Sequence, residues 1–142
     1  MRLKNKIAII TGAASGFGKG IAEKFTKEGA KIIMVDINPR LLKKVSNNLS
    51  QDYFVADVSK NSSFKSLFKY AYKKYNQIDI FVNNAGITHK PKFMEIVTEK
   101  EFDKVFSVNS KSVYFCAKYF VPKMKKVKRG VILNVASTAG LS

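Results

Sequence analysis

A short apolar run followed by three glycines constrains the fold of this chain more than any other stretch. Residues 7–10 are apolar, as in a strand buried on both faces of a parallel sheet, and glycines follow at Gly12, Gly16 and Gly18. Helical spacing of apolar residues begins directly afterwards, at Ile21. A helix N-terminus offers unpaired N–H groups and a positive dipole end, and glycines let an anion approach the backbone. The stretch therefore predicts a strand, a phosphate-binding turn and a helix in succession.

The rest of the chain alternates between the same two kinds of element. We expect strands at residues 7–10, 31–35, 53–55, 78–82 and 131–135. We expect helices at residues 16–28, 38–49 and 64–75, a loop over 87–97, and a long helical region from 98 to about 126. Because strands alternate with helices and parallel crossovers are right-handed, this order predicts an α/β fold. The expected architecture is a doubly wound parallel sheet with helices on both faces, in three layers, and it forms one domain of residues 1–142.

Local signals mark several of the predicted helix ends. Gly29 is placed to end the first helix in a left-handed conformation. Asn38 is a good N-cap for the second helix, with Pro39 at its first position. Thr98 and Glu101 have the spacing of a capping box. These signals support the predicted boundaries independently of the apolar pattern.

Composition indicates a folded protein in a reducing compartment. The hydrophobic fraction of 46% is that of a globular domain. The one cysteine, Cys116, has no partner for a disulfide and no neighbours that would complete a metal site, so we predict no bound metal. No stretch is long and apolar enough to predict a membrane span. We therefore expect a soluble, cytoplasmic protein that does not associate with membranes.

The net charge of +16 leaves two interpretations open. The excess comes from 23 lysines against 3 arginines, spread along the chain rather than gathered in one block. Proteins that recognise nucleic-acid bases use bidentate arginine contacts and stacking aromatic residues at defined positions. This pattern is absent here. A solvated, lysine-rich surface that favours anionic ligands is the preferred interpretation, so no nucleic-acid partner is expected. A basic nucleic-acid-binding domain is the minor alternative.

Ligands of such sheets lie beyond the carboxyl ends of the strands, so the residues after each strand carry the functional prediction. Asp36 follows the second strand and is placed to accept both hydroxyls of an adenosine ribose. A 2′-phosphate there would meet a like charge, which favours NAD over NADP. The alternative for Asp36 is a helix-capping or surface aspartate.

Five motifs together resemble those of the short-chain dehydrogenase/reductase family. Thr11 with the glycine turn resembles the family's Thr-Gly-x-x-x-Gly-x-Gly motif, and residues 83–86 match its Asn-Asn-Ala-Gly motif. Asp57 with Val58 resembles the adenine contact, and Asn109 the asparagine inside the long helix. Ser137 resembles the catalytic serine after the fifth strand. The motifs stand in the family's order and cover the chain from Lys6 onward.

The resemblance implies a strand order of 3-2-1-4-5 and an oxidoreductase that moves hydride between NAD and a secondary alcohol or ketone. Similar sequences include the 3-oxoacyl-carrier-protein reductases. The implied catalytic residues are Ser137, next to the substrate oxygen, and Asn109, which kinks its helix locally and supports a proton relay. The implied cofactor-binding residues are Gly12, Ser15, Gly16, Phe17, Gly18, Asp36, Ile37, Asp57, Val58, Asn83, Ala85 and Gly86.

The family's catalytic Tyr-x-x-x-Lys motif, which follows the serine, is not in this sequence. Three internal matches begin at Tyr70, Tyr114 and Tyr119, but all precede Ser137 and arise readily by chance in a lysine-rich chain. We therefore interpret the sequence as the N-terminal portion of a longer chain that lacks strands 6 and 7. We expect the full-length form to be a homodimer or homotetramer. We expect the 142 residues alone to bind dinucleotide weakly at best and to show no turnover.

Two function hypotheses from different classes follow. The first is an NAD-dependent oxidoreductase, and the second is a dinucleotide-binding fragment without catalysis, favoured for the chain as written. His89 is the one histidine and is interpreted as a solvated loop residue. Cys116 is interpreted as a small buried hydrophobic residue.

Overall fold

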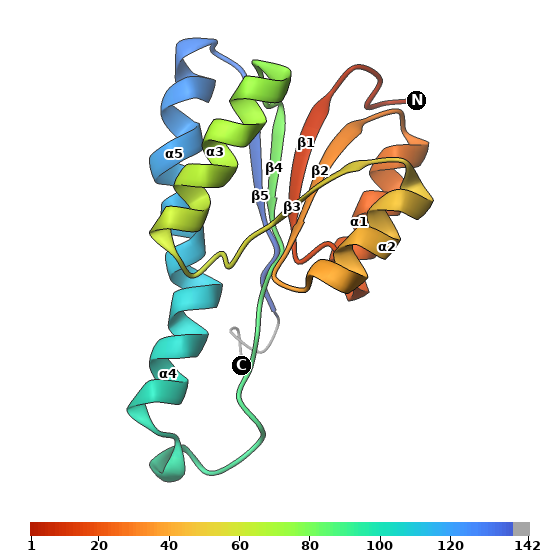
Figure 1. Cartoon of the computed structure of the whole chain (residues 1–142). Helices are drawn as coiled ribbons and strands as arrows, with labels where there is room; N and C mark the ends of the chain where they lie inside the picture. The colour runs from red at the N-terminus through yellow and green to blue at the C-terminus, as the bar shows by residue number, and fades with distance from the viewer. Residues whose placement is uncertain (138–142) are drawn as a thin grey trace.

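Five parallel strands lie between two layers of helices in the computed structural model, which describes residues 1–137 (Figure 1). The strands are β1 (Ile7–Thr11), β2 (Lys31–Asp36), β3 (Asp52–Val55), β4 (Ile80–Asn83) and β5 (Val131–Asn134). The α-helices are α1 (Gly16–Lys27), α2 (Pro39–Leu49), α3 (Asn61–Tyr75), α4 (Glu99–Phe106) and α5 (Ser112–Lys126). A 3₁₀ turn, η1 (Met94–Ile96), precedes α4, and a π-helical turn, η2 (Ser107–Lys111), joins α4 to α5.

The sheet has the predicted doubly wound topology. The strand order is β3-β2-β1-β4-β5, and every neighbouring pair is parallel. Helices α1 and α2 cover one face, and α3 and α5 cover the other (Figure 1). Helix α4 continues beyond the sheet at the edge where the strands end (Figure 1). Both the fold class and the strand order are therefore confirmed.

Alternation along the strands divides the apolar residues between the two faces. Ile9 and Ile33 pack with Phe64, Phe81 and Phe120 against the α3 and α5 layer. The residues that face the α1 and α2 layer include Ile10, Ile32, Met34, Leu42, Val45 and Val82. Successive side chains of a strand point to opposite faces, and helices on both sides require both sets to be apolar. This explains why the strands read as continuous apolar runs.

Two helix caps have the predicted geometry. The Asn38 side chain accepts a hydrogen bond from the Leu41 N–H at 3.1 Å, with Pro39 in the first turn. The Thr98 hydroxyl accepts from the Glu101 N–H at 3.3 Å, and Glu101 accepts from the Thr98 N–H at 3.0 Å. These bonds satisfy N–H groups that the helices cannot pair internally.

Strand β4 starts later than predicted, at Ile80 rather than Ile78. The N–H of Ile7 in β1 donates to the Asp79 carboxylate at 2.9 Å instead of to a strand carbonyl. Asp79 also accepts from Gln77 and pairs with Arg129 at 3.4 Å. The Asp79 side chain thus links the start of β1 to the residues just before β4 and β5, while the Asp79 N–H donates to the Ile7 carbonyl at 2.9 Å.

The long helical region is not one continuous α-helix, because η2 interrupts it. Asn109, at which the resemblance implies a local kink, lies within this π-helical turn. The Ser112 hydroxyl donates to the Val108 carbonyl at 2.5 Å at the start of α5. A π turn contains one more residue than an α-helical turn, and it therefore changes the direction in which the side chains before and after it point.

The edge strand β3 is held to α3 by a cluster around Asp52. Its carboxylate accepts from the Lys74 ammonium at 2.6 Å and also from the Tyr75 hydroxyl. Burial works to raise the pKa of Asp52, but the hydrogen bonds from Lys74 and Tyr75 outweigh it and hold the pKa below its ordinary value. The carboxylate form is therefore more favourable in the folded state than in the unfolded one.

We predict that Asp52→Asn lowers the free energy of unfolding by about 1 to 2 kcal/mol near pH 7, because hydrogen bonds to a charged group are lost. Since the folded pKa lies below the unfolded one, this contribution exists above about pH 4 and disappears as the pH falls through the folded value. Urea denaturation at pH 7, 5 and 3 measures it, with the exposed Glu95→Gln in η1 as the control. An Asp52→Asn effect that is equal at all three pH values would contradict the assignment.

Candidate functional site

The Thr11 hydroxyl joins the carboxyl ends of the two central strands. It accepts hydrogen bonds from the N–H groups of Asn84 and Ala85, both at 3.0 Å. It also lies 3.3 Å from the Val82 carbonyl, to which it donates. The order of the strands reverses between β1 and β4, which is where ligands of doubly wound sheets bind. One buried side chain therefore fixes the geometry of this position.

Asn84 closes the same connection from the other side. Its Nδ2 donates to the Thr11 carbonyl at 3.0 Å and lies 3.4 Å from the Gly12 carbonyl. A Cβ on Gly12 would lie 2.9 Å from both the Asn84 Nδ2 and the Ala85 Cα, and Gly12 has a φ of +65°. The turn after β1 therefore needs glycine at position 12 for space and for conformation.

The other two glycines of the turn, Gly16 and Gly18, have different structural roles. A Cβ on Gly18 would lie 2.1 Å from the Gly12 carbonyl oxygen, so Gly18 lets α1 pack directly on the turn. Gly16 has a φ of +51°, and a Cβ there would meet nothing within 4 Å. Gly18 is thus a packing glycine, whereas Gly16 lies beside open space at the N-terminus of α1.

A cavity of about 1050 Å³ opens at this edge of the sheet. Nine of the predicted cofactor residues line it, namely Gly12, Ser15, Phe17, Asp36, Ile37, Asp57, Val58, Ala85 and Gly86. The described lining also includes Asn84, Lys60 and Asn61 at the start of α3, and one face of α4 and η2. The structure thus gathers residues from four strand ends around one cavity.

Two of the three aspartates that line the cavity, Asp36 and Asp57, are oriented by hydrogen bonds. The two Asp36 oxygens accept from the N–H groups of Ala14 at 3.1 Å and Asn38 at 3.0 Å. Asp57 accepts from the N–H of Ser59 at 2.9 Å and from its hydroxyl at 2.7 Å. Asp36 therefore links the glycine turn to the end of β2, and it also accepts the N–H of Asn38, the N-cap residue of α2.

Gly16, Gly18 and Asn83 are the predicted cofactor residues that are absent from the described lining of the cavity. Asn83 is buried, and its Nδ2 donates to the Asn134 Oδ1 at 2.8 Å, which joins β4 to β5. Burial raises the pKa of the neighbouring Cys116 thiol to about 12, against the opposing effect of a hydrogen bond with Asn83. Cys116 is thus a neutral, buried thiol, as interpreted from the sequence.

The two predicted catalytic residues come from different elements. Asn109 in η2 accepts from the Ile87 N–H at 2.9 Å and donates to the Ile87 carbonyl at 2.8 Å. Its Oδ1 would lie 3.6 Å from a Cβ on Gly86. Ser137 is exposed beyond the end of β5. Asn109 therefore anchors the segment that follows β4 to the π turn.

The other candidate groups named here are absent from the described lining of the cavity, although Tyr119 contacts one lining residue, Asn61. Tyr70 and Lys74 are in α3, where the Lys74 ammonium lies 5.9 Å from the centre of the Tyr70 ring. Tyr119 in α5 donates its hydroxyl to the Asn61 Oδ1 at 2.8 Å. His89 lies in the loop before η1, bonded to the Lys90 carbonyl. Within residues 1–137, no group of three or more His, Cys, Asp or Glu residues could hold a metal ion.

Sequence reasoning missed the side chains that α4 and η2 bring to the cavity, along with the roles of Thr11 and Asn84. The α4 and η2 residues that line it are Lys100, Asp103, Lys104, Ser107, Val108 and Lys111. Their spacing of three and four residues is the signal that could have placed them on one helix face.

A parallel sheet with a glycine turn before α1, an aspartate after β2 and a cavity at the reversal point defines a dinucleotide-binding class of fold. A family model described as short chain dehydrogenase matches residues 6–142. The chain belongs to this family.

Curated relatives and solved structures agree with the family. The chain is 38% identical to the 4-formylbenzenesulfonate dehydrogenase of Comamonas testosteroni, across 99% of the chain and 58% of that protein. It is 36% identical to the 3-oxoacyl-[acyl-carrier-protein] reductase of Thermotoga maritima, across 99% of the chain and 59% of that protein. A crystal structure of a 3-ketoacyl-(acyl-carrier-protein) reductase from Brucella melitensis complexed with NADH has a TM-score of 0.89 and 40% identity, and the match covers 96% of the chain and 59% of that structure.

The chain spans somewhat more than half the length of the curated relatives that it matches. Across the part of the chain that the structure describes, no helix is long and apolar enough to cross a membrane.

The glycine geometry predicts that two alanine substitutions in α1 have opposite effects. Gly18→Ala is expected to lower the free energy of unfolding by about 3 kcal/mol or more, because the new Cβ meets backbone atoms. Gly20→Ala, where a Cβ meets nothing within 4 Å, is expected to raise it by about 0.5 to 1 kcal/mol through helix propensity. Chemical denaturation of both variants measures the difference, and equal effects would contradict the packing role of Gly18.

Proposed function

We propose that the cavity binds NAD(H), and that the chain contributes this site to an oxidoreductase acting on a secondary alcohol or ketone. The observation that carries the proposal is the connection made by Thr11 and Asn84. It holds the glycine turn beside the N-terminus of α1, with Asp36 at the end of the adjacent strand. Membership of the short chain dehydrogenase family and the NADH-bound relative support it. Bound NAD(H) would supply the hydride chemistry, and the protein would supply binding and orientation.

The pyrophosphate would lie against Gly12, Ser15, Gly16, Phe17 and Gly18. The open space beside Gly16 and the close packing at Gly12 fit a backbone that approaches a ligand. Ser15 is the N-cap residue of α1, and its side chain makes no capping hydrogen bond there. The first N–H groups of α1 can therefore donate to an anion.

The adenosine half would extend toward β2 and β3. Asp36 and Ile37 would contact its ribose, with the Asp36 carboxylate accepting from the hydroxyls. Asp57 and Val58 would contact the adenine. Asp36 already accepts two backbone N–H bonds, which fix the direction of its charge. A 2′-phosphate would meet this charge directly, so NADP is the less favoured cofactor.

The nicotinamide half would lie on the β4 side of the cavity, near Asn83, Ala85 and Gly86. Asn83 would act from within the sheet, by aligning β4 with β5. Ser137 would donate to the substrate oxygen and stabilise the charge that develops there. Asn109 would position the segment after Gly86 through its two bonds to Ile87 and would support proton transfer.

The substrate and the assembly are the finer parts of the proposal. We propose a small alcohol or ketone, in line with the dehydrogenase and 3-oxoacyl reductase names of the relatives. We also propose a homodimer or homotetramer for the full-length form. Exposed aromatic side chains on α4 and α5, including Phe102, Phe106 and Tyr114, support an interface on that side.

The charge of Asp36 predicts a preference for NADH over NADPH. We expect NADH to bind at least about 10-fold more tightly, equivalent to about 1.4 kcal/mol. Asp36→Asn keeps an acceptor but removes the charge, so the preference should fall to within about 3-fold. Fluorescence titration with both nucleotides measures this, and Asp103→Asn, on the α4 wall, is the matched control. An unchanged preference in Asp36→Asn would contradict the role of Asp36, and no binding of either nucleotide would contradict the proposed function.

A further inference from the structure

One face of α4 and η2 forms a lysine-rich wall of the cavity. The ammonium groups come from Lys100, Lys104 and Lys111, and Lys60 at the start of α3 also lines the cavity. All four side chains are exposed. We call these four residues the lysine rim. None of them belongs to the glycine turn or to the strand ends.

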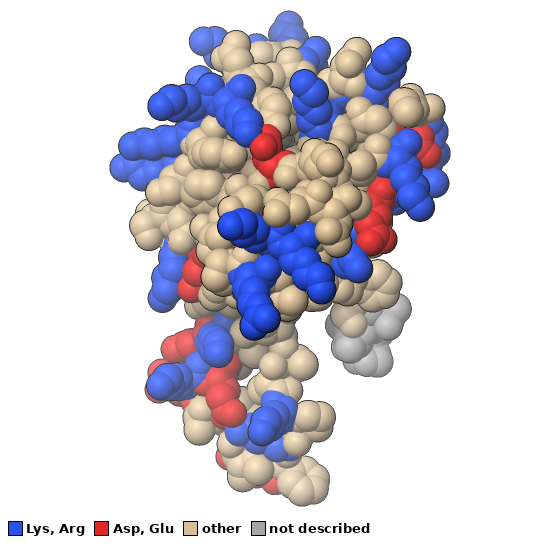
Figure 2. Space-filling model, turned by 45° about the vertical axis from the view of Figure 1, so that its right-hand side comes forward, with Lys and Arg blue, Asp and Glu red and all other residues tan. Residues whose placement is uncertain are grey.

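Of the three acidic residues of α4, Glu99 and Glu101 are absent from the described lining of the cavity, and Asp103 is part of it. Figure 2 shows acidic side chains gathered on the lower extension of the molecule. Glu99 and Glu101 do not line the cavity, and Glu101 is bonded to Lys92 and Thr98, which hold its pKa near 2. Asp103 is the one carboxylate of α4 among the described lining residues. The charges of α4 are thus sorted by face, with the cavity face net positive.

The lysine rim makes no ion pair with a carboxylate within residues 1–137. The ion pairs whose residues lie nearest to the rim lysines in the sequence are Lys92–Glu101 and Lys74–Asp52. Neither pair includes a rim lysine. The Lys111 ammonium lies 5.8 Å from the centre of the Phe115 ring. Three carboxylates share the described lining with the rim, those of Asp36, Asp57 and Asp103, and Asp36 and Asp57 are hydrogen-bonded to N–H or hydroxyl groups. The four lysines of the rim outnumber these three carboxylates by one, so the described lining is net positive.

Unpaired cations around a cavity act on an anionic ligand before it binds. Exposed cations beside a cleft raise the local concentration of an anionic ligand and so its association rate. Lysine is suited to this, because its ammonium is a hydrated point charge on a flexible stem and does not need a fixed bonding geometry. Such an effect appears in the association rate rather than in the dissociation rate.

We propose that Lys60, Lys100, Lys104 and Lys111 steer the anionic dinucleotide into the cavity and set its association rate without holding it once bound. This rests on the proposed function, since it takes the ligand to be a dinucleotide with a charged pyrophosphate. It assigns the α4 wall a kinetic role that is separate from the contacts at the glycine turn.

Stopped-flow measurement of NADH binding tests this with Lys100→Gln/Lys104→Gln/Lys111→Gln. At an ionic strength of about 20 mM, the association rate should fall about 5- to 10-fold while the dissociation rate stays within about 2-fold. At about 500 mM, where the Debye length is only a few Å, the two proteins should associate at nearly equal rates. Lys104→Glu alone should lower the low-salt rate as well, and it provides a second, smaller change to the surface.

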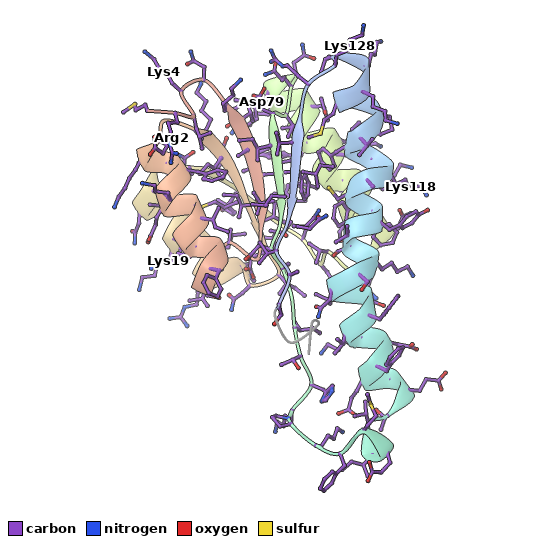
Figure 3. The ribbon with its side chains drawn as sticks, turned by 180° about the vertical axis from the view of Figure 1, so that it is seen from behind. Arg2, Lys4, Lys19, Asp79, Lys118 and Lys128 are labelled. Carbon is purple, nitrogen blue, oxygen red and sulfur yellow. The ribbon has the colours of Figure 1, made fainter. Side chains whose placement is uncertain are left out.

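A matched control removes the same charge from the opposite end of the molecule. Figure 3 places Lys4 and Lys128 at the end where the strands begin, and Lys125 lies in the last turn of α5. The variant Lys4→Gln/Lys125→Gln/Lys128→Gln should slow association less than about 2-fold at low salt, because those charges lie far from the cavity. A slowing equal to that of the rim variant would show a net-charge effect and overturn the proposal. A faster dissociation in the rim variant would show direct contact and would also overturn it. Binding of NADH with unchanged rates overturns the steering alone, whereas no binding by the unaltered chain overturns the proposed function with it.

Discussion

The hydrogen bonds of the Thr11 hydroxyl are the interaction on which the rest of the structure depends. The hydroxyl joins β1 to the two residues that follow β4, at the point where the strand order reverses. Asn84 completes the connection by returning its amide to the Thr11 carbonyl. The backbone ladder pairs residues 8–10 of β1 with residues 80–82 of β4, and the bonds of Thr11 and Asn84 extend the link between the two strands beyond these paired residues. The glycine turn is consequently fixed to the central strands by hydrogen bonds.

Two features of the cavity follow from that connection. Because Asn84 packs against Gly12, the turn can accept no Cβ there, and α1 can pack closely only through Gly18. Because Ala85 is fixed, the chain leaves β4 in a set direction and meets Asn109, which binds the Ile87 backbone from within η2. The π turn then places the lysine face of α4 and η2 toward the cavity. The glycine turn and the α4 wall are thus parts of one connected structure.

The sequence predicted the elements well, because apolar runs and capping residues are local signals. The Thr98–Glu101 capping box and the Asn38 cap formed as expected. The late start of β4 was missed, because the contact of the Asp79 carboxylate with the Ile7 N–H joins residues far apart in the sequence and has no local signal. Asn83 and Asn84 are identical in type, and only the alternation of the strand decides that Asn83 faces Asn134 while Asn84 reaches the turn. The lysine rim was missed because it depends on the course of the chain through η2.

The central claim is that the glycine turn fixed by Thr11 and Asn84 binds the dinucleotide. Backbone amide chemical shifts, recorded while NADH is added to the ¹⁵N-labelled chain, test it most directly. The predicted result is a saturable shift of the Gly12, Gly16 and Gly18 amides and of Ala85 and Gly86, with little change at Gly29 or Gly130, which lie at the other end of the strands. Shifts confined to the lysine-rich surface, or an absence of shifts at the three glycines of the turn, would contradict the account.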